Sequence, residues 1–121
     1  MTDLELQDYL RENGYAPHVI RGGRAGLLRR WREFVEQVER GYTLGIEDYR
    51  NDLDIRGILA LIEGELTPAE ADELRALDER LKGMLVPVPE RIWESAPGDP
   101  FWDFGIPRNA GPELLADLRS E

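Results

Sequence analysis

Residues 24–40 have the sequence RAGLLRRWREFVEQVER, which carries the clearest structural signal in the chain. Its large apolar residues recur at intervals of three and four positions: Leu27, Leu28, Trp31, Phe34, Val35 and Val38. That spacing places them on one face of an α-helix, which we expect to be buried against the rest of the protein. Gly41 follows directly, and glycine is common just past the end of a helix. We therefore predict an amphipathic helix over residues 24–40.

A first helix is predicted ahead of this one, over residues 2–12. The sequence TDLE at residues 2–5 has the spacing of a capping box, in which two side chains satisfy free backbone N–H groups at a helix start. The Asn-Gly pair at residues 13–14 ends the helix, since both residues tolerate a left-handed backbone. We expect residues 15–23, YAPHVIRGG, to be a loop, with Pro17 blocking a helix.

Two more helices are predicted on the C-terminal side. Residues 46–63 carry apolar side chains at helical spacing, interrupted by Gly57. A glycine inside a helix costs about 1 kcal/mol relative to alanine, so Gly57 indicates close packing or a kink. The sequence TPAE at residues 67–70 combines a capping threonine, a proline at the first helical position and a glutamate that completes a capping box. This last helix of the bundle is expected to end near residues 81–83.

The C-terminal third has a different character. Prolines and glycines favour an extended or loop segment over residues 84–111, in which residues 84–88 or 91–95 could pair as an edge strand. A short final helix is predicted over residues 112–119. The sequence as a whole predicts a mostly α single domain over residues 1–121. We expect a bundle of three to four helices over about residues 2–83, with the extended aromatic C-terminal segment packed across it.

Composition and charge restrict the class of protein. The chain has 121 residues, a net charge of −10 and no cysteine, which excludes disulfides and thiolate chemistry. No run of 18 apolar residues is present, so we expect no membrane span, and MTDLELQDYL at the N-terminus lacks the basic and apolar parts of a secretory signal. We expect a bacterial cytoplasmic protein. Nucleic-acid binding is disfavoured because it requires neutralisation of phosphates.

The charge is distributed unevenly. Residues 1–40 carry seven basic and seven acidic residues, whereas residues 41–121 carry eight basic and eighteen acidic residues and hold the whole net charge. Within the balanced part, residues 18–32 contain five arginines and no acid. This basic island in an acidic chain is a feature that bears on binding partners rather than on fold.

Residues 47–56, EDYRNDLDIR, form the most concentrated charged stretch. On a helix, residues four apart share a face, so Asp48 lies next to Asp52, and Asp52 next to Arg56. We first expect a structural helix held by charge pairs, with Asp52 or Asp54 partly buried against an arginine of the basic island. A partner-binding surface that includes Asn51 ranks second, and a divalent-cation or catalytic site third. No metal site is assigned, because a further carboxylate is missing and His18 stands alone.

Residues 18–32, HVIRGGRAGLLRRWR, allow two interpretations. Glycines ahead of a helix start can form an anion cradle, in which Arg21, Arg24, Arg29 and Arg30 would bind phosphate. The sequence matches neither common phosphate-loop pattern, however. The favoured interpretation is that Arg24, Arg29, Arg30 and Arg32 pair with the acidic second half of the chain.

No catalytic residue or cofactor is predicted. The serines, Ser95 and Ser120, lack a glycine elbow, and His18 is expected in a loop or cap. Trp102 belongs to an aromatic loop that is either a lid on the core or an exposed recognition patch, and the lid is favoured.

The sequences at residues 31–42, WREFVEQVERGY, and 48–56, DYRNDLDIR, resemble those of a group of small acidic bacterial proteins without an assigned function. In that group, an ENGY sequence precedes the first of these stretches, and one similar to FWDFGIPRNAGPEL closes the chain. Counterparts stand here at residues 12–15 and 101–114. The resemblance covers most of the chain and implies no activity, cofactor or catalytic residue.

Two functions are compatible with these features. The first is a non-enzymatic acidic interaction module, such as an inhibitor, antitoxin or immunity-like factor, that binds a basic protein partner. Small size, negative charge and the lack of a credible nucleophile favour it. The second is a protein or enzyme that binds a phosphate- or nucleotide-bearing ligand with the arginines at positions 21–30 opposite Asp48 and Asp52.

Overall fold

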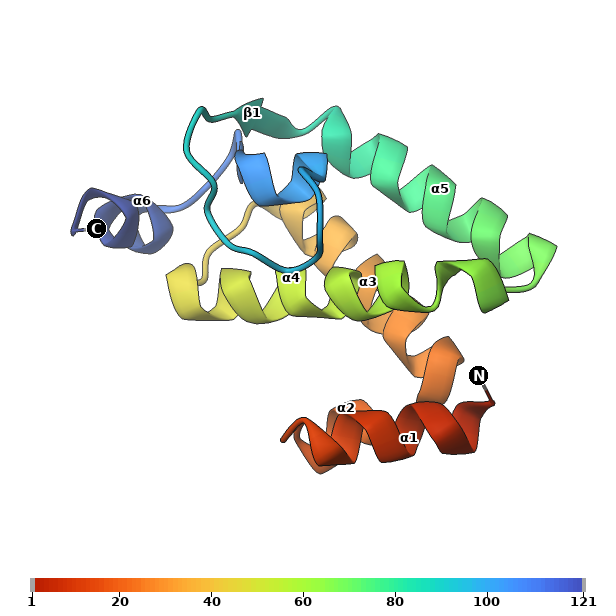
Figure 1. Ribbon diagram of the computed structural model, residues 1–121. Helices are drawn as coiled ribbons and strands as arrows, with labels where there is room; N and C mark the ends of the chain where they lie inside the picture. The colour runs from red at the N-terminus through yellow and green to blue at the C-terminus, as the bar shows by residue number, and fades with distance from the viewer. Residues whose placement is uncertain (1, 121) are drawn as a thin grey trace.

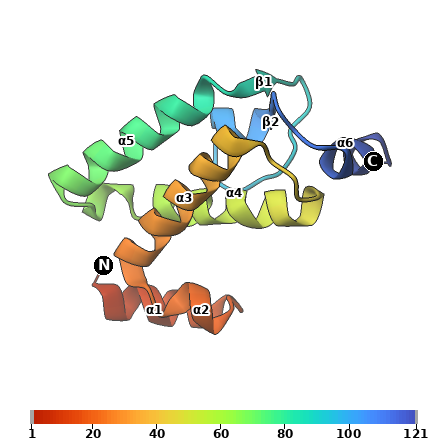
Figure 2. The same cartoon turned by 180° about the vertical axis from the view of Figure 1, so that it is seen from behind.

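The computed structural model describes residues 2–120 and is mostly helical, with one short two-stranded sheet. The predicted fold class is confirmed. Figures 1 and 2 show three long helices crossing one another, two small helices beside one end of α3, and a C-terminal segment laid across α4. The long helices are α3 (Gly23–Arg40), α4 (Ile46–Leu61) and α5 (Pro68–Lys82).

The core forms where the apolar stripe of α3 packs against α4 and α5. Trp31 stacks on Phe34 with ring centroids 5.0 Å apart, and the Tyr42 and Tyr49 rings meet edge to face at 5.4 Å. All four rings are buried. The Tyr49 hydroxyl donates a hydrogen bond to the Gly105 carbonyl at 2.8 Å. The Tyr42 hydroxyl donates to Asp52 Oδ2 at 3.0 Å, so both buried tyrosines have polar partners for their hydroxyls.

The N-terminal region contains one correction to the sequence analysis. Helix α1 (Asp3–Glu12) begins with the predicted capping box and lies against the first part of α3. Residues 15–23 were predicted to be a loop, but Pro17–Ile20 form the short helix α2. Pro17 occupies the start of this helix, where its missing N–H has no intrahelical partner to lose. Proline therefore begins a helix here rather than preventing one.

The C-terminal segment pairs with itself as it crosses the helices. Strand β1 (Leu85–Pro87) runs antiparallel to β2 (Gly105–Pro107), with Val86 opposite Ile106. The prediction of a strand within residues 84–88 is confirmed, whereas residues 91–95 form no strand. Between the strands lies η2 (Phe101–Phe104), and the chain ends in α6 (Pro112–Ser120), beside the start of α4.

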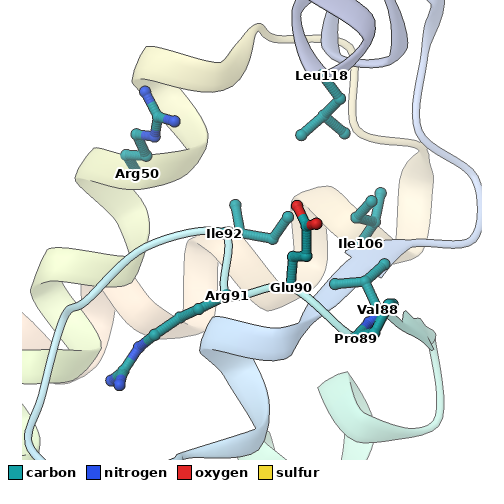
Figure 3. A pocket seen from close by; sticks show the side chains of 8 residues that line it. All are labelled: Arg50, Val88, Pro89, Glu90, Arg91, Ile92, Ile106 and Leu118. Carbon is teal, nitrogen blue, oxygen red and sulfur yellow. The ribbon is translucent and has the colours of Figure 1, made fainter. Parts of the chain in front are cut away.

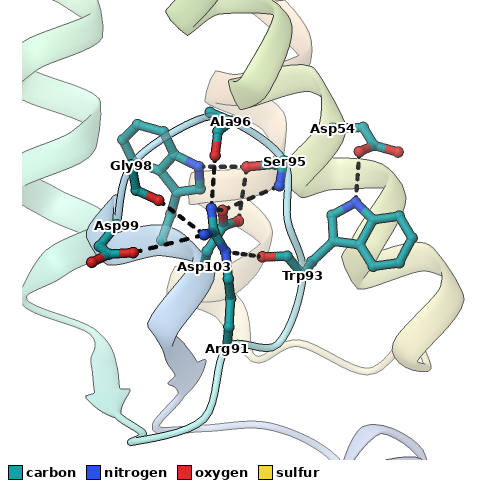
Figure 4. A network of polar contacts seen from close by, with 9 residues as sticks. Asp54, Arg91, Trp93, Ser95, Ala96, Gly98, Asp99 and Asp103 are labelled. Atoms are coloured by element: carbon teal, nitrogen blue, oxygen red, sulfur yellow. Dashed lines mark hydrogen bonds and ion pairs between the residues drawn. The ribbon is translucent and has the colours of Figure 1, made fainter.

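A polar network fixes the loop between β1 and η2. The Asp103 carboxylate is fully buried and accepts hydrogen bonds from Ser95 Oγ at 2.8 Å and from Arg91 Nη2 at 2.8 Å. Arg91 also donates to the carbonyls of Trp93, Ala96 and Gly98, so its guanidinium lies inside the curve of the loop (Figure 4). A loop organised around its own buried ion pair is held in one conformation.

The loop touches α4 at Gly57. A Cβ atom at this position would lie 2.1 Å from the Ser95 carbonyl oxygen, far inside van der Waals contact. A glycine at position 57 is thus required for the backbone of the loop to approach the helix this closely. Of the two predicted explanations for this glycine, close packing is the correct one.

A buried ion pair joins α4 to α5. Arg56 is 3% exposed, and its Nη2 and Nε donate to the two Asp78 carboxylate oxygens at 2.9 and 3.1 Å. Trp31 Nε1 of α3 donates to the same carboxylate at 3.0 Å. The guanidinium carbon of Arg56 lies 4.0 Å from the ring centroid of buried Trp102. This one arginine therefore ties all three long helices to the aromatic segment, and Trp102 belongs to the lid rather than to an exposed patch.

We expect Gly57→Ala to lower the free energy of unfolding by about 2 kcal/mol or more, because overpacking outweighs the better helix propensity of alanine. Gly26→Ala in α3 is the matched control, since a Cβ there has nothing within 4 Å. It should be neutral or slightly stabilising. Urea unfolding followed by tryptophan fluorescence measures both. A neutral Gly57→Ala would show that the loop does not rest on α4.

We expect Arg56→Met to cost about 3–5 kcal/mol, the range for removal of one partner from a buried ion pair. Arg75→Met is the control, because Arg75 pairs with Asp72 at a site where both side chains are at least 70% exposed. Such exposed pairs contribute under about 1 kcal/mol. The comparison uses the same unfolding measurement. Equal effects of the two substitutions would contradict a central role for Arg56.

Candidate functional site

A cavity of about 510 Å³ brings together several of the predicted site residues. Arg30 reaches it from α3, and Asn51, Asp52 and Asp54 reach it from α4. The opposite wall is the chain from the end of α1 through α2. The remaining lining residues are Asn13, Gly14, Tyr15, Ala16, His18, Val19 and Ile55. We refer to this cavity as the Asp52 pocket.

Asp52 is the most unusual group in the pocket. Its Oδ2 accepts a hydrogen bond from the Tyr42 hydroxyl at 3.0 Å. Burial raises the pKa of Asp52 from its usual value near 3.8 to about 6, and the nearby Asp48 charge adds to this effect. The Tyr42 hydrogen bond and the Arg30 charge oppose it without cancelling it. The carboxylate is therefore held in a position that disfavours its charge.

Asp54 is the second half-buried carboxylate of the pocket. Its Oδ1 accepts a hydrogen bond from Trp93 Nε1 at 2.6 Å, and this contact positions the indole ring against α4 (Figure 4). Burial raises the pKa of Asp54, and the Trp93 hydrogen bond lowers it in part. Ion pairs in the described residues 2–120 use other carboxylates, so Asp52 and Asp54 have no cation in direct contact.

Arg30 and His18 are held together at the rim. Arg30 Nη2 donates to the backbone carbonyl of His18 at 3.0 Å, which joins α3 to α2. The reversal of the chain ahead of α2 depends on Gly14, whose φ of 79° belongs to the left-handed region. The short helix α2 then turns His18 toward the cavity. This residue was expected in a loop or cap, and the structure instead places it in the lining of the pocket.

The basic island is dispersed rather than gathered into one anion site. Arg21 and Arg29 are exposed, whereas Arg24 Nε lies 3.5 Å from Asp3 Oδ1. The Asp3 carboxylate also approaches Gly23 and accepts from the Arg24 backbone N–H at 3.4 Å. The start of α3 is thus already occupied by a carboxylate of the chain itself. Of the four candidate arginines, Arg30 is the one that shares a cavity with Asp52.

One predicted pairing within residues 47–56 is corrected. Arg56 was expected to pair with Asp52 one turn away, but it turns to the core and binds Asp78. Asp48 lies near Asp52, as its effect on the pKa of that carboxyl shows, and is itself exposed, lining a separate cavity of about 380 Å³ with Glu47, Glu113 and Asp117. We refer to that cavity as the acidic cleft. Asp117 accepts the Ile46 backbone N–H at 3.0 Å and so caps α4.

The acidic cleft offers no assembled metal site. Within residues 2–120, no three histidine, cysteine or acidic side chains are grouped closely enough to hold a metal ion. Four carboxylates around one hollow nevertheless make this end of α4 strongly negative. Its physical effect is a local field that attracts cations and repels anions.

Another hollow lies between the start of α4, α6 and the loop, with a volume of about 430 Å³ (Figure 3). Ile92, Ile106 and Leu118 give it an apolar floor, while Arg91 extends away into the polar network of the loop (Figure 3). Arg50 at its edge already has an interaction partner. Glu90 is thus the charged group that remains for a ligand, and the chemistry offered is less specific than in the Asp52 pocket.

Comparison of the chain with protein-family models, with curated proteins and with solved structures found no significant match. Function must therefore be inferred from the geometry of the site. Among the helices formed by residues 2–120, none has the length and apolar character needed to cross a bilayer.

Tyr15 and Tyr42 are site residues that the sequence analysis did not assign to a site. Tyr42 lies ten positions before Asp52, in the connection to α4, and no local spacing rule relates the two. Tyr15 lies in the turn between α1 and α2. A tyrosine next to an Asn-Gly helix stop was the available signal, since an aromatic residue in a turn commonly packs against a neighbouring element.

We expect Asp52→Asn to stabilise the protein near pH 8. A carboxylate whose pKa rises on folding binds more protons in the folded state than in the unfolded state. The protein therefore loses stability as the pH rises through the interval from 3.8 to about 6. The amide removes this cost and can still accept from Tyr42. The expected gain is roughly 1–2 kcal/mol at pH 8, falling toward zero below pH 4.

Urea unfolding at pH 4, 5, 6 and 8 measures this effect. Asp72→Asn is the matched control, because Asp72 is exposed on α5 and pairs with Arg75. Its effect should stay small at each of these pH values. An Asp52→Asn variant that is less stable than the wild type at pH 8 would contradict a charge-disfavouring pocket.

Proposed function

We propose that this protein is an acidic interaction module that binds a basic protein partner, and that the Asp52 pocket receives an arginine or lysine side chain of that partner. One observation carries the proposal: two half-buried carboxylates, Asp52 and Asp54, line one cavity, and no ion pair among residues 2–120 includes either of them. A basic side chain entering the pocket supplies that missing charge.

Burial has already removed part of the water from the Asp52 carboxylate, so an incoming cation meets a less shielded charge than at an open surface. Tyr42 fixes Oδ2, and within the described part of the chain no group donates to Oδ1. A guanidinium or ammonium group can donate to that oxygen. Binding would lower the pKa of Asp52 and recover the stability that its charge costs.

Electrostatics beyond the pocket supports a basic partner. The chain has a net charge of −10, and the acidic cleft adds Glu47, Asp48, Glu113 and Asp117 at the start of α4. Fields of this sign accelerate encounter with a positive surface. The same field disfavours the phosphate-binding alternative, because a phosphate beside Arg30 would also face Asp52 and Asp54.

A non-enzymatic role agrees with the state of the candidate nucleophiles. Ser95 Oγ accepts from Trp102 Nε1 at 2.9 Å and donates to the Asp103 carboxylate, which is already paired with Arg91. Ser120 Oγ donates to the Ala116 carbonyl at 3.1 Å. Neither hydroxyl donates to a histidine or lysine in the manner of an activated serine. These contacts favour recognition rather than covalent chemistry.

The test is an NMR titration of the protein with N-acetyl-arginine amide and, separately, with inorganic phosphate. We expect the arginine amide to shift the backbone amides of residues 51–55 and His18, and Asp52→Asn to weaken this binding about tenfold, as for loss of one charged hydrogen bond. Asp72→Asn should leave it unchanged. Binding of the arginine amide should also weaken at pH 5, where Asp52 is mostly protonated.

Other results of the titration would favour the phosphate-binding alternative or a different cation site. Phosphate-induced shifts around Arg30, without any response to the arginine amide, would replace the proposal with an anion-binding function. Equal binding of the arginine amide to the wild type and to Asp52→Asn would move the cation site away from this pocket.

A further inference from the structure

A second cavity continues the Asp52 pocket along α4. It has a volume of about 580 Å³, and most of its lining is apolar or aromatic. Tyr15 lines both cavities, so the two hollows are neighbours. The other lining residues are Tyr9, Gly57, Ile58, Ala60, Leu61, Ser95, Ala96 and Pro97. We refer to the two cavities together as the α4 trough.

The arrangement of the helices explains the trough. In both views, α1 and α2 lie alongside α4, while α3 crosses at an angle to them (Figures 1 and 2). The two small helices pack against each other and against α3. The side of α4 that faces them is consequently not covered by a close helix–helix contact. Tyr15, in the turn between α1 and α2, fills part of the space.

The wall of the trough exposes large apolar side chains at its far end. Leu61 is 56% exposed at the last position of α4, and Tyr9 is 37% exposed on α1. A pair of such residues facing one hollow is a feature of binding surfaces rather than of isolated surface positions. The polar end of the trough is 7–9 residues away along α4, at Asp52 and Asp54. A helix rises 1.5 Å per residue, so the two ends are about 10–14 Å apart.

We propose that the α4 trough is the docking site for a short basic amphipathic segment of a protein partner. An arginine or lysine of that segment occupies the Asp52 pocket, and an apolar side chain lies between Tyr9, Tyr15 and Leu61. This inference rests on the proposed function and extends it, because it states the shape and chemistry of the partner segment.

Charge complementarity selects this occupant. Two carboxylates lie at one end of the trough. Burial raises the pKa of Tyr15, and the Asp54 charge raises it further, so charge and apolar surface are adjacent there. A second copy of the chain would bring another net charge of −10 to the same surface. An anionic membrane would be repelled for the same reason. A basic segment gains from both ends of the trough at once.

The distance between the ends fixes the pattern of the segment. A separation of about 10–14 Å corresponds to seven to nine positions in a helix. In an extended chain it corresponds to about three or four positions. We therefore expect a basic residue and a large apolar residue at one of these two spacings.

A random 12-residue peptide library displayed on phage and panned against the full-length protein tests the inference. We expect enriched peptides to carry the basic and apolar residues at one of the two spacings. Synthetic versions of the enriched peptides are then titrated against purified variants. Leu61→Ser should weaken binding about fivefold or more, through loss of buried apolar area, and Asp52→Asn should weaken it about tenfold.

Two matched controls isolate these effects. Leu115→Ser removes another exposed leucine, on α6, at 42% exposure and outside the trough, and Asp72→Asn removes a charge on α5. Both should bind as the wild type does. Circular dichroism confirms that each variant is folded.

Different outcomes would overturn the proposed docking site in the α4 trough and the proposed cation site in the Asp52 pocket. If Asp52→Asn weakens binding and Leu61→Ser does not, the trough is not the docking site, although the basic side chain still binds the pocket. If Asp52→Asn binds as tightly as the wild type, the pocket does not receive a cation and both proposals fall. Enriched peptides without a basic residue would also overturn both.

Discussion

The contact between Arg56 and Asp78 is the interaction on which the other parts of this protein depend. The arginine comes from α4, the aspartate from α5, and Trp31 of α3 donates to the same carboxylate. Trp102 covers the guanidinium from the C-terminal segment. Charges in a protein interior are costly unless each is paired, so the three helices and the aromatic segment must all be in place for this pair to be tolerated. It therefore specifies one arrangement among several that apolar packing alone would allow.

The Asp52 pocket shows the opposite treatment of charge. Asp52 lies one turn before Arg56 on α4, yet no ion pair among residues 2–120 includes its carboxylate, which accepts a hydrogen bond from a tyrosine hydroxyl. Residues four apart share a helix face, but the Arg56 side chain reaches into the core, whereas Asp52 lines a cavity. The same helix thus carries a carboxylate-paired arginine in the core and, one turn earlier, a carboxylate whose charge is disfavoured.

Much of the helical framework could be predicted from the sequence because its signals are local. Capping boxes at Thr2 and Thr67 and the apolar stripe of α3 each lie within one segment. The partners of charged residues could not be predicted, because Arg56 and Asp78 are 22 positions apart and nothing local disfavours the nearer Asp52. The acidic stretch was therefore recognised as important, but its division between core, pocket and acidic cleft required the tertiary structure. The short helix α2 does not follow from the sequence pattern, because a proline can either end a helix or begin one, and the local residues do not decide between the two.

The close contact between the loop and Gly57 of α4 has a consequence for how this chain can vary in length. The Ser95 carbonyl rests on Gly57, and Arg91 gathers the carbonyls on both sides of that point. An inserted residue between Trp93 and Ala96 would move the Ser95 carbonyl away from Gly57. It would also break the hydrogen bonds that Arg91 donates to the carbonyls on either side. An insertion near Gly98, at the exposed tip of the loop, would be absorbed as a wider bend. Length variation among descendants of this sequence should thus collect at the tip, while the stretch over the helix keeps its number of residues.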